Sequence, residues 1–432
     1  MVRYEIEGGR TLCGECRIQG SKNAVLPMMS AALLNKGCTV LHNCPKIDDV
    51  YCMIRIMEHM GCLVRWEGHT LIIDAENIRC CEVVSEESTK MRSSIILMGA
   101  LLGRCRQAVL GEPGGCVIGA RPIDFHLNAF RKMGADIQQR ESYLWVQALE
   151  LTGNAVTLEK PSVGATENIL LAAVLAKGVT RIYNAAREPE IVELCRLLCA
   201  MGADIIGAGT SCILVKGVKR LHDAQITVMS DRIAAGTYML AAAATGGEIF
   251  ISNPPVGQLK SLLKVLNVCG VPSSEDIQGI HVGKMDHYRG IPFLETGPYP
   301  GFPTDLQSPL LAMLLKARGK SIIKENIFES RFRVVEEFRK LGAHVSCEGC
   351  TCVVEGVPAL FGTTLCSGEL RGGAALLIAG LMAEGKTTVL DGGYIQRGYE
   401  GIEEQLMQLG ARITAKEEYF AGDAFANKRK KE

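Results

Sequence analysis

The sequence lacks an excess of charge of either sign. Lysine plus arginine and aspartate plus glutamate both total 47, so the formal net charge is zero. Proteins that bind nucleic acid usually carry a strong basic excess, and this balance argues against that class. Histidine is scarce, with 8 residues in 432, and aromatic residues make up 5%. A zero total still permits local basic clusters, which a site for phosphate groups would need.

Long apolar runs and a secretory signal are also missing. No apolar run approaches the roughly 18 residues that a membrane-spanning helix needs. Residues 1–10 are charged and contain no apolar core of a signal peptide. We therefore expect a cytoplasmic protein with no membrane insertion and no nucleic-acid partner. A chain of 432 residues, 47% of them hydrophobic, fits two globular domains of about 200 residues each.

Cysteine is abundant, with 18 residues. In a reducing compartment most of these should be free thiols that act as small core hydrophobes. The pairs Cys13/Cys16 and Cys347/Cys350 have CxxC spacing, but they lack His or Cys partners at the usual distances for zinc. We expect strand and turn positions for them, and no metal. The basic run at residues 428–431 predicts a solvated tail over residues 421–432.

A short signature recurs six times along the chain: a hydrophobic residue, a glycine, usually an alanine, and then a residue typical of strands. The glycines are Gly61, Gly134, Gly202, Gly270, Gly342 and Gly410. They lie about 70 residues apart, and a fixed period of this kind indicates repeated structural units. Six units account for almost the whole chain.

A second signature precedes each of these glycines. An Ala/Leu-rich run ends in glycine and is followed by a β-rich segment, with the glycine at Gly37, Gly103, Gly178, Gly247, Gly319 and Gly385. Glycine after a last helical turn suits the left-handed position that ends a helix. Each unit is therefore predicted to run helix, strand, second helix, strand, turn, strand. In the fifth unit the second helix should cover residues 332–340, with Val334, Val335, Phe338 and Leu341 on its apolar face. Three units per half predict two similar α/β domains.

Residues 19–24 open the first Ala/Leu-rich helix with Ser21, Lys22 and Asn23. A helix N-terminus beside an ammonium group is a natural site for a phosphate or carboxylate. Serine and asparagine are also ordinary helix caps, so both interpretations stay open.

Residues 111–124 contain four glycines and two prolines, which predicts a loop. The loop carries Cys116 and, five residues later, Arg121. A nearby guanidinium favours the thiolate and lowers a cysteine pKa. Gly114 and Gly115 directly before the cysteine make dense core packing improbable, so we favour a reactive thiol on a loop that can cover a substrate.

Asp305 follows Pro303-Thr304 and precedes a Leu-rich helix. It could cap that helix or act as a general base, and the sequence does not decide between them. Six arginines stand close to glycines or helix starts, namely Arg92, Arg187, Arg232, Arg331, Arg371 and Arg397. Their planar fork suits phosphates and carboxylates, and their recurrence in several repeats suggests convergence on an anionic ligand.

The stretches SKNAVLP, KMRSSI, PGGCVIGARPID, KPSVGATEN, NAAREPEIV, SDRIAAGT, FPTDLQ, ENIFESRF, ELRGGAAL and QRGYEGIEEQL occur in this order. Together they resemble the family of enolpyruvyl transferases that act on UDP-N-acetylglucosamine. The resemblance implies two inside-out α/β barrel-like domains, each of three βαβαββ-type repeats, with the active site in the cleft between them. It places residues 21–229 in the first domain, and residues 1–20 and 230–420 in the second.

The resemblance also implies a reaction and its residues. The enolpyruvyl group of phosphoenolpyruvate moves to the 3-hydroxyl of UDP-N-acetylglucosamine and phosphate leaves, which is the first committed step of peptidoglycan synthesis. Cys116 would be the general acid and the target of fosfomycin, and Asp305 the base, with no cofactor or metal. Lys22, Arg121 and Arg397 would hold phosphoenolpyruvate. The nucleotide-sugar and further substrate contacts would come from Asn23, Arg92, Arg121, Pro122, Ile123, Asp124, Phe125, Lys160, Ser162, Val163, Gly164, Ile327, Arg331 and Arg371.

Two positions depart from the family pattern. Glu369 stands where the family usually has Asp, and Gln396 stands where an acidic residue usually precedes Arg397. Weakened turnover and a second, less active paralogue are both open explanations. Three other functions compete: transfer to shikimate 3-phosphate, a paralogue that only binds the UDP-sugar, and an RNA-terminal phosphate cyclase. The motifs disfavour all three, and none of the motifs contains the histidine that a cyclase would need. The oligomeric state stays open.

Overall fold

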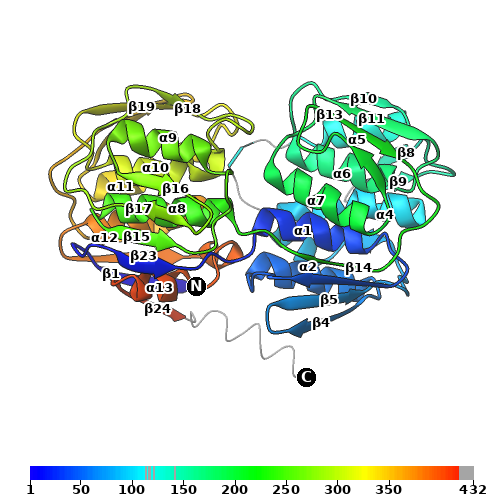
Figure 1. The fold of residues 1–432 in the computed structure, drawn as a ribbon, viewed down its shortest axis with the longest axis horizontal. Coiled ribbons are helices and arrows are strands. Elements are labelled where there is room, and N and C mark those ends of the chain that lie inside the picture. The colour runs from blue at the N-terminus through cyan, green and yellow to red at the C-terminus, as the bar shows by residue number, and fades with distance from the viewer. Residues whose placement is uncertain (112–113, 115–117, 120–121, 141–142, 418–432) are drawn as a thin grey trace.

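The computed structural model describes residues 1–111, 114, 118–119, 122–140 and 143–417. Cys116, Arg121 and the predicted basic tail lie outside these residues. The described elements form two lobes, which Figure 1 shows side by side. One lobe surrounds a hydrophobic core drawn from residues 24–228, and the other a core drawn from residues 2–18 and 233–413.

The first lobe contains three of the predicted repeats. The first has α1 (Lys22–Ala32), β3 (Cys38–His42), α2 (Asp48–His59), β4 (Leu63–Glu67) and β5 (Thr70–Asp74). The second has β6 (Glu82–Val83), α3 (Glu86–Lys90), η1 (Arg92–Ile96), α4 (Leu97–Cys105), β7 (Gln107–Gly111), α5 (Asp124–Lys132), β8 (Asp136–Arg140) and β9 (Tyr143–Gln147). The third has β10 (Ala155–Thr157), α6 (Val163–Ala173), β11 (Val179–Tyr183), α7 (Pro189–Ala200), β12 (Asp204–Ile206) and β13 (Cys212–Lys216).

The second lobe repeats this order. Its first unit has α8 (Arg232–Ala244), β15 (Glu248–Ile251), α9 (Lys260–Cys269), β16 (Ser273–Glu275) and β17 (Ile280–Val282). The next has β18 (Leu294–Glu295), η2 (Thr304–Leu306), α10 (Gln307–Leu314), β19 (Lys320–Lys324), η3 (Arg331–Val334), α11 (Val335–Lys340), β20 (His344–Glu348) and β21 (Thr351–Glu355). The last has β22 (Thr364–Ser367), α12 (Leu370–Met382), β23 (Lys386–Asp391), η4 (Ile395–Arg397), α13 (Ile402–Gln408) and β24 (Arg412–Glu417).

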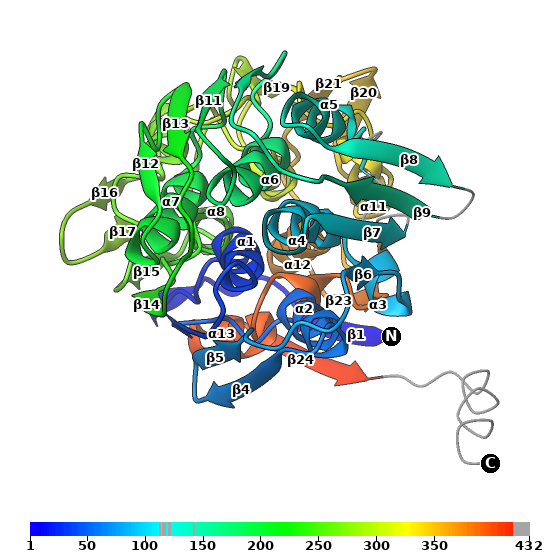
Figure 2. The same ribbon diagram turned by 90° about the vertical axis from the view of Figure 1, so that its right-hand side faces the viewer.

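Three further strands cross between the repeats: β1 (Val2–Glu7), β2 (Cys13–Cys16) and β14 (Ala224–Thr227). Each unit forms a four-stranded sheet. One of its two edge strands runs parallel to the neighbouring strand. In the first unit of each lobe the edge strand is exchanged. Strand β14 precedes α8 but pairs with β3, while β2 precedes α1 but pairs with β15. Strand β1 lies between β23 and β24, so the beginning of the chain completes the last sheet. Figure 2 shows the sheets arranged around the helices.

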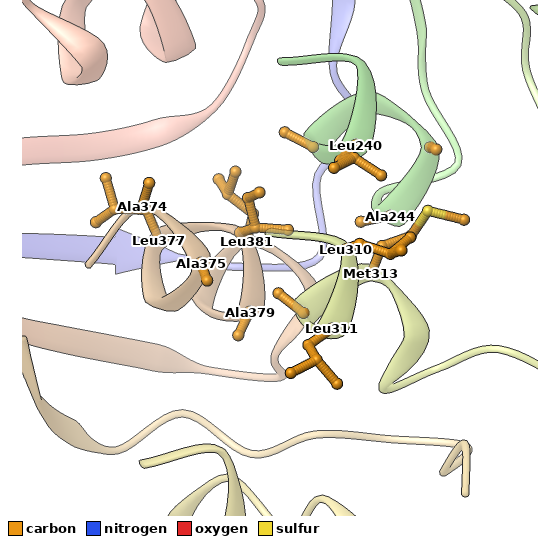
Figure 3. Close-up of a cluster of buried hydrophobic side chains, with 14 of the residues drawn as sticks. Leu240, Ala244, Leu310, Leu311, Met313, Ala374, Ala375, Leu377, Ala379 and Leu381 are labelled. Atoms are coloured by element: carbon orange, nitrogen blue, oxygen red, sulfur yellow. The ribbon is translucent and has the colours of Figure 1, made fainter. Parts of the chain in front are cut away.

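The Ala/Leu-rich helices lie inside the lobes and the sheets lie outside. Every residue of α8, α10 and α12 is buried, as expected for helices that are apolar on all sides. Figure 3 shows side chains of these three helices meeting in the core of the second lobe, among them Leu240, Leu311 and Leu377. Each buried leucine contributes about 1.5–3 kcal/mol to folding. The architecture confirms the predicted fold class of repeated α/β units.

The chain passes between the lobes twice, and the two passages lie against each other. Gly20 and Ser230 form an antiparallel bridge, and the amide of Lys22 donates to the Asp231 carboxylate at 3.0 Å. A Cβ on Gly20 would lie 1.8 Å from the carbonyl oxygen of Asn43, so only glycine fits here. This contact fixes the start of α1 relative to the start of α8.

The glycines of the first signature behave as predicted. All six have positive φ, between 82° and 102°. Half of the second set do not occupy the predicted left-handed position. Helix α4 continues past Gly103, and Arg106 takes the left-handed conformation instead. In the fourth unit Gly246, rather than Gly247, takes the left-handed conformation. Gly37 also lacks a positive φ. At Gly103 and Gly247 the helix length set by core packing shifts the end of the helix away from the expected glycine.

The predicted apolar face of residues 332–340 is buried, although η3 forms its first part and α11 the rest. The cysteines of the described residues carry free thiols. Cys13 is exposed and Cys16 buried at the two ends of β2, whereas Cys350 lies in the turn after β20. The cross-strand partner of Cys347 is Cys352 rather than Cys350. Within the described ranges, no helix is long and apolar enough to cross a membrane, and no cluster of potential ligands could hold a metal.

Candidate active site

Two cations from different lobes share one buried carboxylate. Lys22, at the start of α1, places Nζ 2.8 Å from Oδ2 of Asp49. Arg397, at the end of η4 in the other lobe, places Nε 2.8 Å from Oδ1 of the same residue. Asp49 lies in the first turn of α2 and is 3% exposed. The structure thus brings together two residues predicted to hold phosphoenolpyruvate, and it adds an acidic partner that the sequence did not reveal.

A second carboxylate also lies between two cations. Oδ1 of Asp305 is 2.5 Å from Nη2 of Arg331, and Oδ2 is 2.9 Å from Nη2 of Arg371. Both arginine side chains are buried, whereas the Asp305 side chain is 26% exposed. Helix α10 begins without a side-chain cap, so the structure removes the capping alternative for Asp305. The carboxylate is presented to solvent by two fixed guanidinium groups.

Glu369 contacts both Arg331 and Arg371, so these three residues and Asp305 form a closed ring of contacts. Its carboxylate accepts from the backbone amides of Arg371, at 2.8 Å, and Gly372, and thereby caps the start of α12. It also lies 3.4 Å from Nη1 of Arg331. Glutamate is an unusual N-cap residue, and here the extended backbone of Glu369 lets the longer side chain fold back onto the helix. The residue that departs from the family pattern therefore holds the two arginines that contact Asp305.

The local charges set the protonation states of these groups. Burial raises the pKa of Asp305, but Arg371 and Arg331, with a smaller effect from Lys22, outweigh it and hold the pKa well below its usual range. Burial likewise opposes the charge on Asp49, yet Lys22 and Arg397 lower its pKa. Burial lowers the pKa of Lys22, Asp49 partly restores it, and the nearby guanidinium groups of Arg397 and Arg371 lower it further. Lys22, Arg371 and Asp305 thus form one electrostatic unit.

Two further predicted arginines, Arg232 and Arg187, make different kinds of contact. Arg232 is buried and its Nε donates to Oε1 of Glu190 at 2.9 Å, an ion pair between α8 and α7 that links the lobes. Arg187 is exposed and its Nε donates to the carbonyl of Gly209 at 3.4 Å. The prediction of convergence is therefore wrong for Arg187, whose side chain reaches a turn of its own repeat instead of the groups around Asp305.

Several residues predicted to contact the nucleotide sugar lie at two neighbouring helix starts. Pro122, Ile123, Asp124 and Phe125 lead into α5, and Lys160, Ser162, Val163 and Gly164 lead into α6. The hydroxyl of Ser162 caps α6 by accepting from the amide of Ala165 at 3.4 Å. Gly164 packs against His126 of α5, so the two starts are adjacent. Unpaired amides at such ends favour bound phosphate.

The other predicted sugar contacts are dispersed. Asn23 follows Lys22 on α1, and Arg92 begins η1, which packs against α1 and α6. Ile327 lies in the second lobe and is 36% exposed. Its amide donates to the Glu325 carboxylate at 2.8 Å. The described structure places these residues on both lobes, as a ligand bound between them would require.

Two described residues of the glycine-rich loop, Ile118 and Gly119, contact the second lobe. The carbonyl of Ile118 accepts from the amide of Ser330 at 3.0 Å. Gly119 lies so close to Glu329 that an added Cβ would be 2.1 Å from its carboxylate. These contacts come directly before Arg331 in the chain. Residues 118–119 therefore lie against the segment that precedes Arg331, whereas Cys116 is outside the described residues.

Sequence reasoning missed Asp49 and Glu190, two acidic residues whose carboxylates form ion pairs between the lobes. Both lie in the first turn of a helix, where acidic residues are common because they complement the helix dipole. That ordinary explanation hid their second role. The sequence carries no signal that separates them from other first-turn acids; only their burial in the structure, where a carboxylate needs a cation, reveals the role.

Comparisons with known proteins show the family to which the chain belongs. The family model for EPSP synthase (3-phosphoshikimate 1-carboxyvinyltransferase) matches residues 6–406, and the chain belongs to this family of enolpyruvyl transferases. Among curated relatives, it is 44% identical over 96% of its length to UDP-N-acetylglucosamine 1-carboxyvinyltransferase 2 of Caldanaerobacter subterraneus subsp. tengcongensis, 99% of which is covered. It is 42% identical to UDP-N-acetylglucosamine 1-carboxyvinyltransferase of Clostridium botulinum, with 96% of this chain and 99% of the relative covered.

Solved structures support the fold. The enolpyruvyl transferase NikO from Streptomyces tendae superposes with a TM-score of 0.87 at 24% identity, covering 96% of this chain and 98% of the other. EPSP synthase from Acinetobacter baumannii gives a TM-score of 0.75 at 20% identity, covering 96% and 100%. At these identities the likeness establishes the two-lobed architecture and leaves the acceptor to be argued from the site.

Proposed function

We propose that this protein transfers the enolpyruvyl group of phosphoenolpyruvate to the 3-hydroxyl of UDP-N-acetylglucosamine and releases phosphate. The observation that carries the proposal is the convergence of Lys22, Arg331, Arg371 and Arg397 on two carboxylates where the lobes meet. Both substrates carry several negative charges, so a site for them needs this density of cations in a protein of zero net charge. Relatives at 42–44% identity bear the name of this activity.

Lys22 and Arg397 are assigned to the phosphate and carboxylate of phosphoenolpyruvate, together with Arg121 from the loop. Lys22 offers an ammonium group at the start of α1, and Arg397 offers a guanidinium from the facing lobe. A guanidinium can bind a carboxylate or phosphate in a bidentate manner, whereas an ammonium acts as a compact charge. Cations from both lobes around one small anion would hold the lobes together while it is bound.

Asp305 is assigned as the base that takes the proton from the sugar hydroxyl. Its lowered pKa keeps it ionised at any working pH, but the same two guanidinium groups reduce its basicity. We infer that bound substrate anions offset the positive charge of Arg331 and Arg371 and so weaken their effect on the pKa of Asp305. The carboxylate would then regain basicity only when substrate is present. Its partly exposed side chain is compatible with direct contact to a hydroxyl group.

The chemistry can be written with atoms in balance. The 3-oxygen of the sugar attacks C2 of phosphoenolpyruvate while Asp305 takes its proton and Cys116 delivers a proton to the methylene carbon. The resulting tetrahedral intermediate then returns a methyl proton to the Cys116 thiolate and expels phosphate, which restores the carbon–carbon double bond. Two residues after Cys116, the carbonyl of Ile118 accepts from the amide of Ser330 in the second lobe. Our proposal is that the predicted loop covers the intermediate and excludes water from it.

The nucleotide sugar is assigned to the starts of α5 and α6, to Asn23 and Arg92, and to Ile327 of the facing lobe. The exposed amides at the two helix starts suit the diphosphate. We further propose domain boundaries at 21–229 and at 1–20 with 230–420, a cytoplasmic location, a role in peptidoglycan synthesis and inhibition by fosfomycin through Cys116. No metal or cofactor is needed for this chemistry.

Phosphate release from phosphoenolpyruvate tests the proposal. The purified protein should release phosphate only when UDP-N-acetylglucosamine is present, and the Cys116→Ala variant should lose nearly all of this release. Binding of UDP-N-acetylglucosamine without phosphate release by a folded wild-type protein would indicate a binding-only paralogue. Release that depends on shikimate 3-phosphate instead would assign the protein to the other branch of the family.

A further inference from the structure

Asp49 occupies the point where the proposed phosphoenolpyruvate cations meet. Its Oδ2 is 2.8 Å from Nζ of Lys22, and its two oxygens lie 2.8 and 3.4 Å from Nε and Nη2 of Arg397. The side chain of Asp49 is 5% exposed and that of Lys22 is 8% exposed. A buried carboxylate with two cationic partners is held tightly, because separating any of the three leaves an uncompensated charge.

The same contact joins the two lobes. Asp49 and Lys22 belong to the first lobe through α2 and α1, whereas Arg397 belongs to the second through η4. Without the carboxylate, the ammonium of Lys22 and the guanidinium of Arg397 would face each other as like charges. Asp49 therefore makes it possible for two cations from different lobes to stand side by side in a nearly dry environment.

We propose that Asp49 is a positioning residue for the phosphoenolpyruvate site and acts through Lys22 and Arg397. It keeps Lys22 protonated and orients the ammonium and guanidinium groups that are proposed to bind the phosphate and carboxylate of the substrate. The inference rests on the proposed function, because it takes phosphoenolpyruvate as the anion bound. It differs from a purely structural role because it acts on the charge of Lys22.

Several charged groups change the pKa of Lys22, and the direction of each change follows from the charge of the group. The charged groups around Lys22 are Asp49 of α2, Arg397 of η4, Arg371 of α12 and Asp305 of η2. Asp49 is the acidic group in direct contact, and it raises the pKa of Lys22 against the effects of burial and of the two guanidinium groups. Removing its charge must therefore lower that pKa further.

The test is the pH profile of kcat/KM for phosphoenolpyruvate in the wild type and in the isosteric Asp49→Asn variant. The alkaline limb, which reports ionisation of the free enzyme, should move to lower pH in the variant. The KM for phosphoenolpyruvate should rise at least about tenfold, which is the value of one hydrogen bond to a charged group, while that for UDP-N-acetylglucosamine changes less than about twofold. Asp48→Asn, the same change one residue earlier, is the matched control and should leave both values near the wild type.

Asp49→Glu keeps the charge and should retain the wild-type alkaline limb even if the longer side chain lowers stability. An unshifted limb in Asp49→Asn, a lower KM for phosphoenolpyruvate, or equal rises of both KM values would overturn the inference. A lower KM would mean that Asp49 competes with the substrate. A wild-type protein that releases no phosphate from these substrates would instead contradict the proposed function, so the two failures are distinguishable.

Discussion

Asp305 and Arg371 form a hydrogen bond of 2.9 Å between Oδ2 and Nη2, joining the 3₁₀ turn before α10 to the first turn of α12. The arginine side chain is 3% exposed and the aspartate 26%. The cation is thus fixed in the core of the second lobe while the carboxylate reaches its surface. This arrangement gives the proposed base a low proton affinity, and it connects this carboxylate to the packing of the central helices.

Asp305→Asn should abolish proton abstraction and leave nucleotide-sugar binding largely intact. We expect kcat to fall by about 100-fold or more, the usual contribution of a general base. Titration calorimetry with UDP-N-acetylglucosamine should give a Kd within a few-fold of the wild type, because its proposed site lies mainly at the starts of α5 and α6. A comparable loss of binding would place Asp305 among the binding groups instead.

The acid side of the stability profile should also depend on Asp305. Its folded-state pKa is held below the unfolded value by Arg371 and Arg331 against the effect of burial. Its stabilising contribution is therefore complete above the unfolded pKa of about 3.9 and is lost as pH falls below it. Chemical unfolding between pH 3 and 7 should show a steeper acid loss for the wild type than for Asp305→Asn. Parallel profiles would contradict the low pKa.

Glu369→Gln should weaken both the second lobe and turnover. An amide oxygen can accept only part of what the carboxylate accepts from Arg371, Gly372 and Arg331, so we expect a loss of about 1–3 kcal/mol in unfolding free energy. The kcat should fall because Arg331 loses one of its two carboxylate partners. Glu369→Asp is the control, since aspartate is a good N-cap and should retain most of the stability. Equal effects of both variants would contradict the importance of the charge.

Glu167→Gln should stabilise the protein increasingly as pH rises. Burial raises the pKa of Glu167 well above its usual value, and the nearby Glu190 and Glu188 raise it further. The folded protein must keep this carboxyl protonated or bear a buried charge, so stability is lost as pH rises from the unfolded pKa of about 4.3 toward the folded one. Melting temperatures at pH 4 and pH 8 should coincide for the two proteins at the lower pH and favour the variant at the higher. A constant difference would contradict the titration.

Much of the fold could be predicted because it is encoded locally and repeated. Gly61 and its five counterparts mark helix ends that only positive φ allows, and their period counts the units. Val334 and Phe338 lie on an apolar face that is legible from spacing alone. The exchange of β2 and β14 between the lobes could not be predicted from residue spacing, because each strand precedes a helix of one repeat and pairs with a strand of another.

The candidate site likewise contains residues that the sequence could predict and residues that it could not. Lys22, Asp305 and Arg397 stand in polar stretches that interrupt the repeat, and that contrast identified them. Asp49 stands in an ordinary first helical turn, and its partner Arg397 is almost 350 residues away in the chain. Side-chain pairs of that separation depend on how the lobes meet, which composition and periodicity do not encode. The prediction that a helix ends at Gly103 was wrong for a related reason, because packing of the core sets where the helix stops.

The measurement that tests the central claim most directly is an acceptor competition. The protein is incubated with phosphoenolpyruvate and equal concentrations of UDP-N-acetylglucosamine and shikimate 3-phosphate, and the products are identified by mass spectrometry. We predict that only UDP-N-acetylglucosamine gains the enolpyruvyl group, in an amount equal to the phosphate released. Enolpyruvyl transfer to shikimate 3-phosphate, or phosphate release with neither acceptor modified, would contradict the assignment.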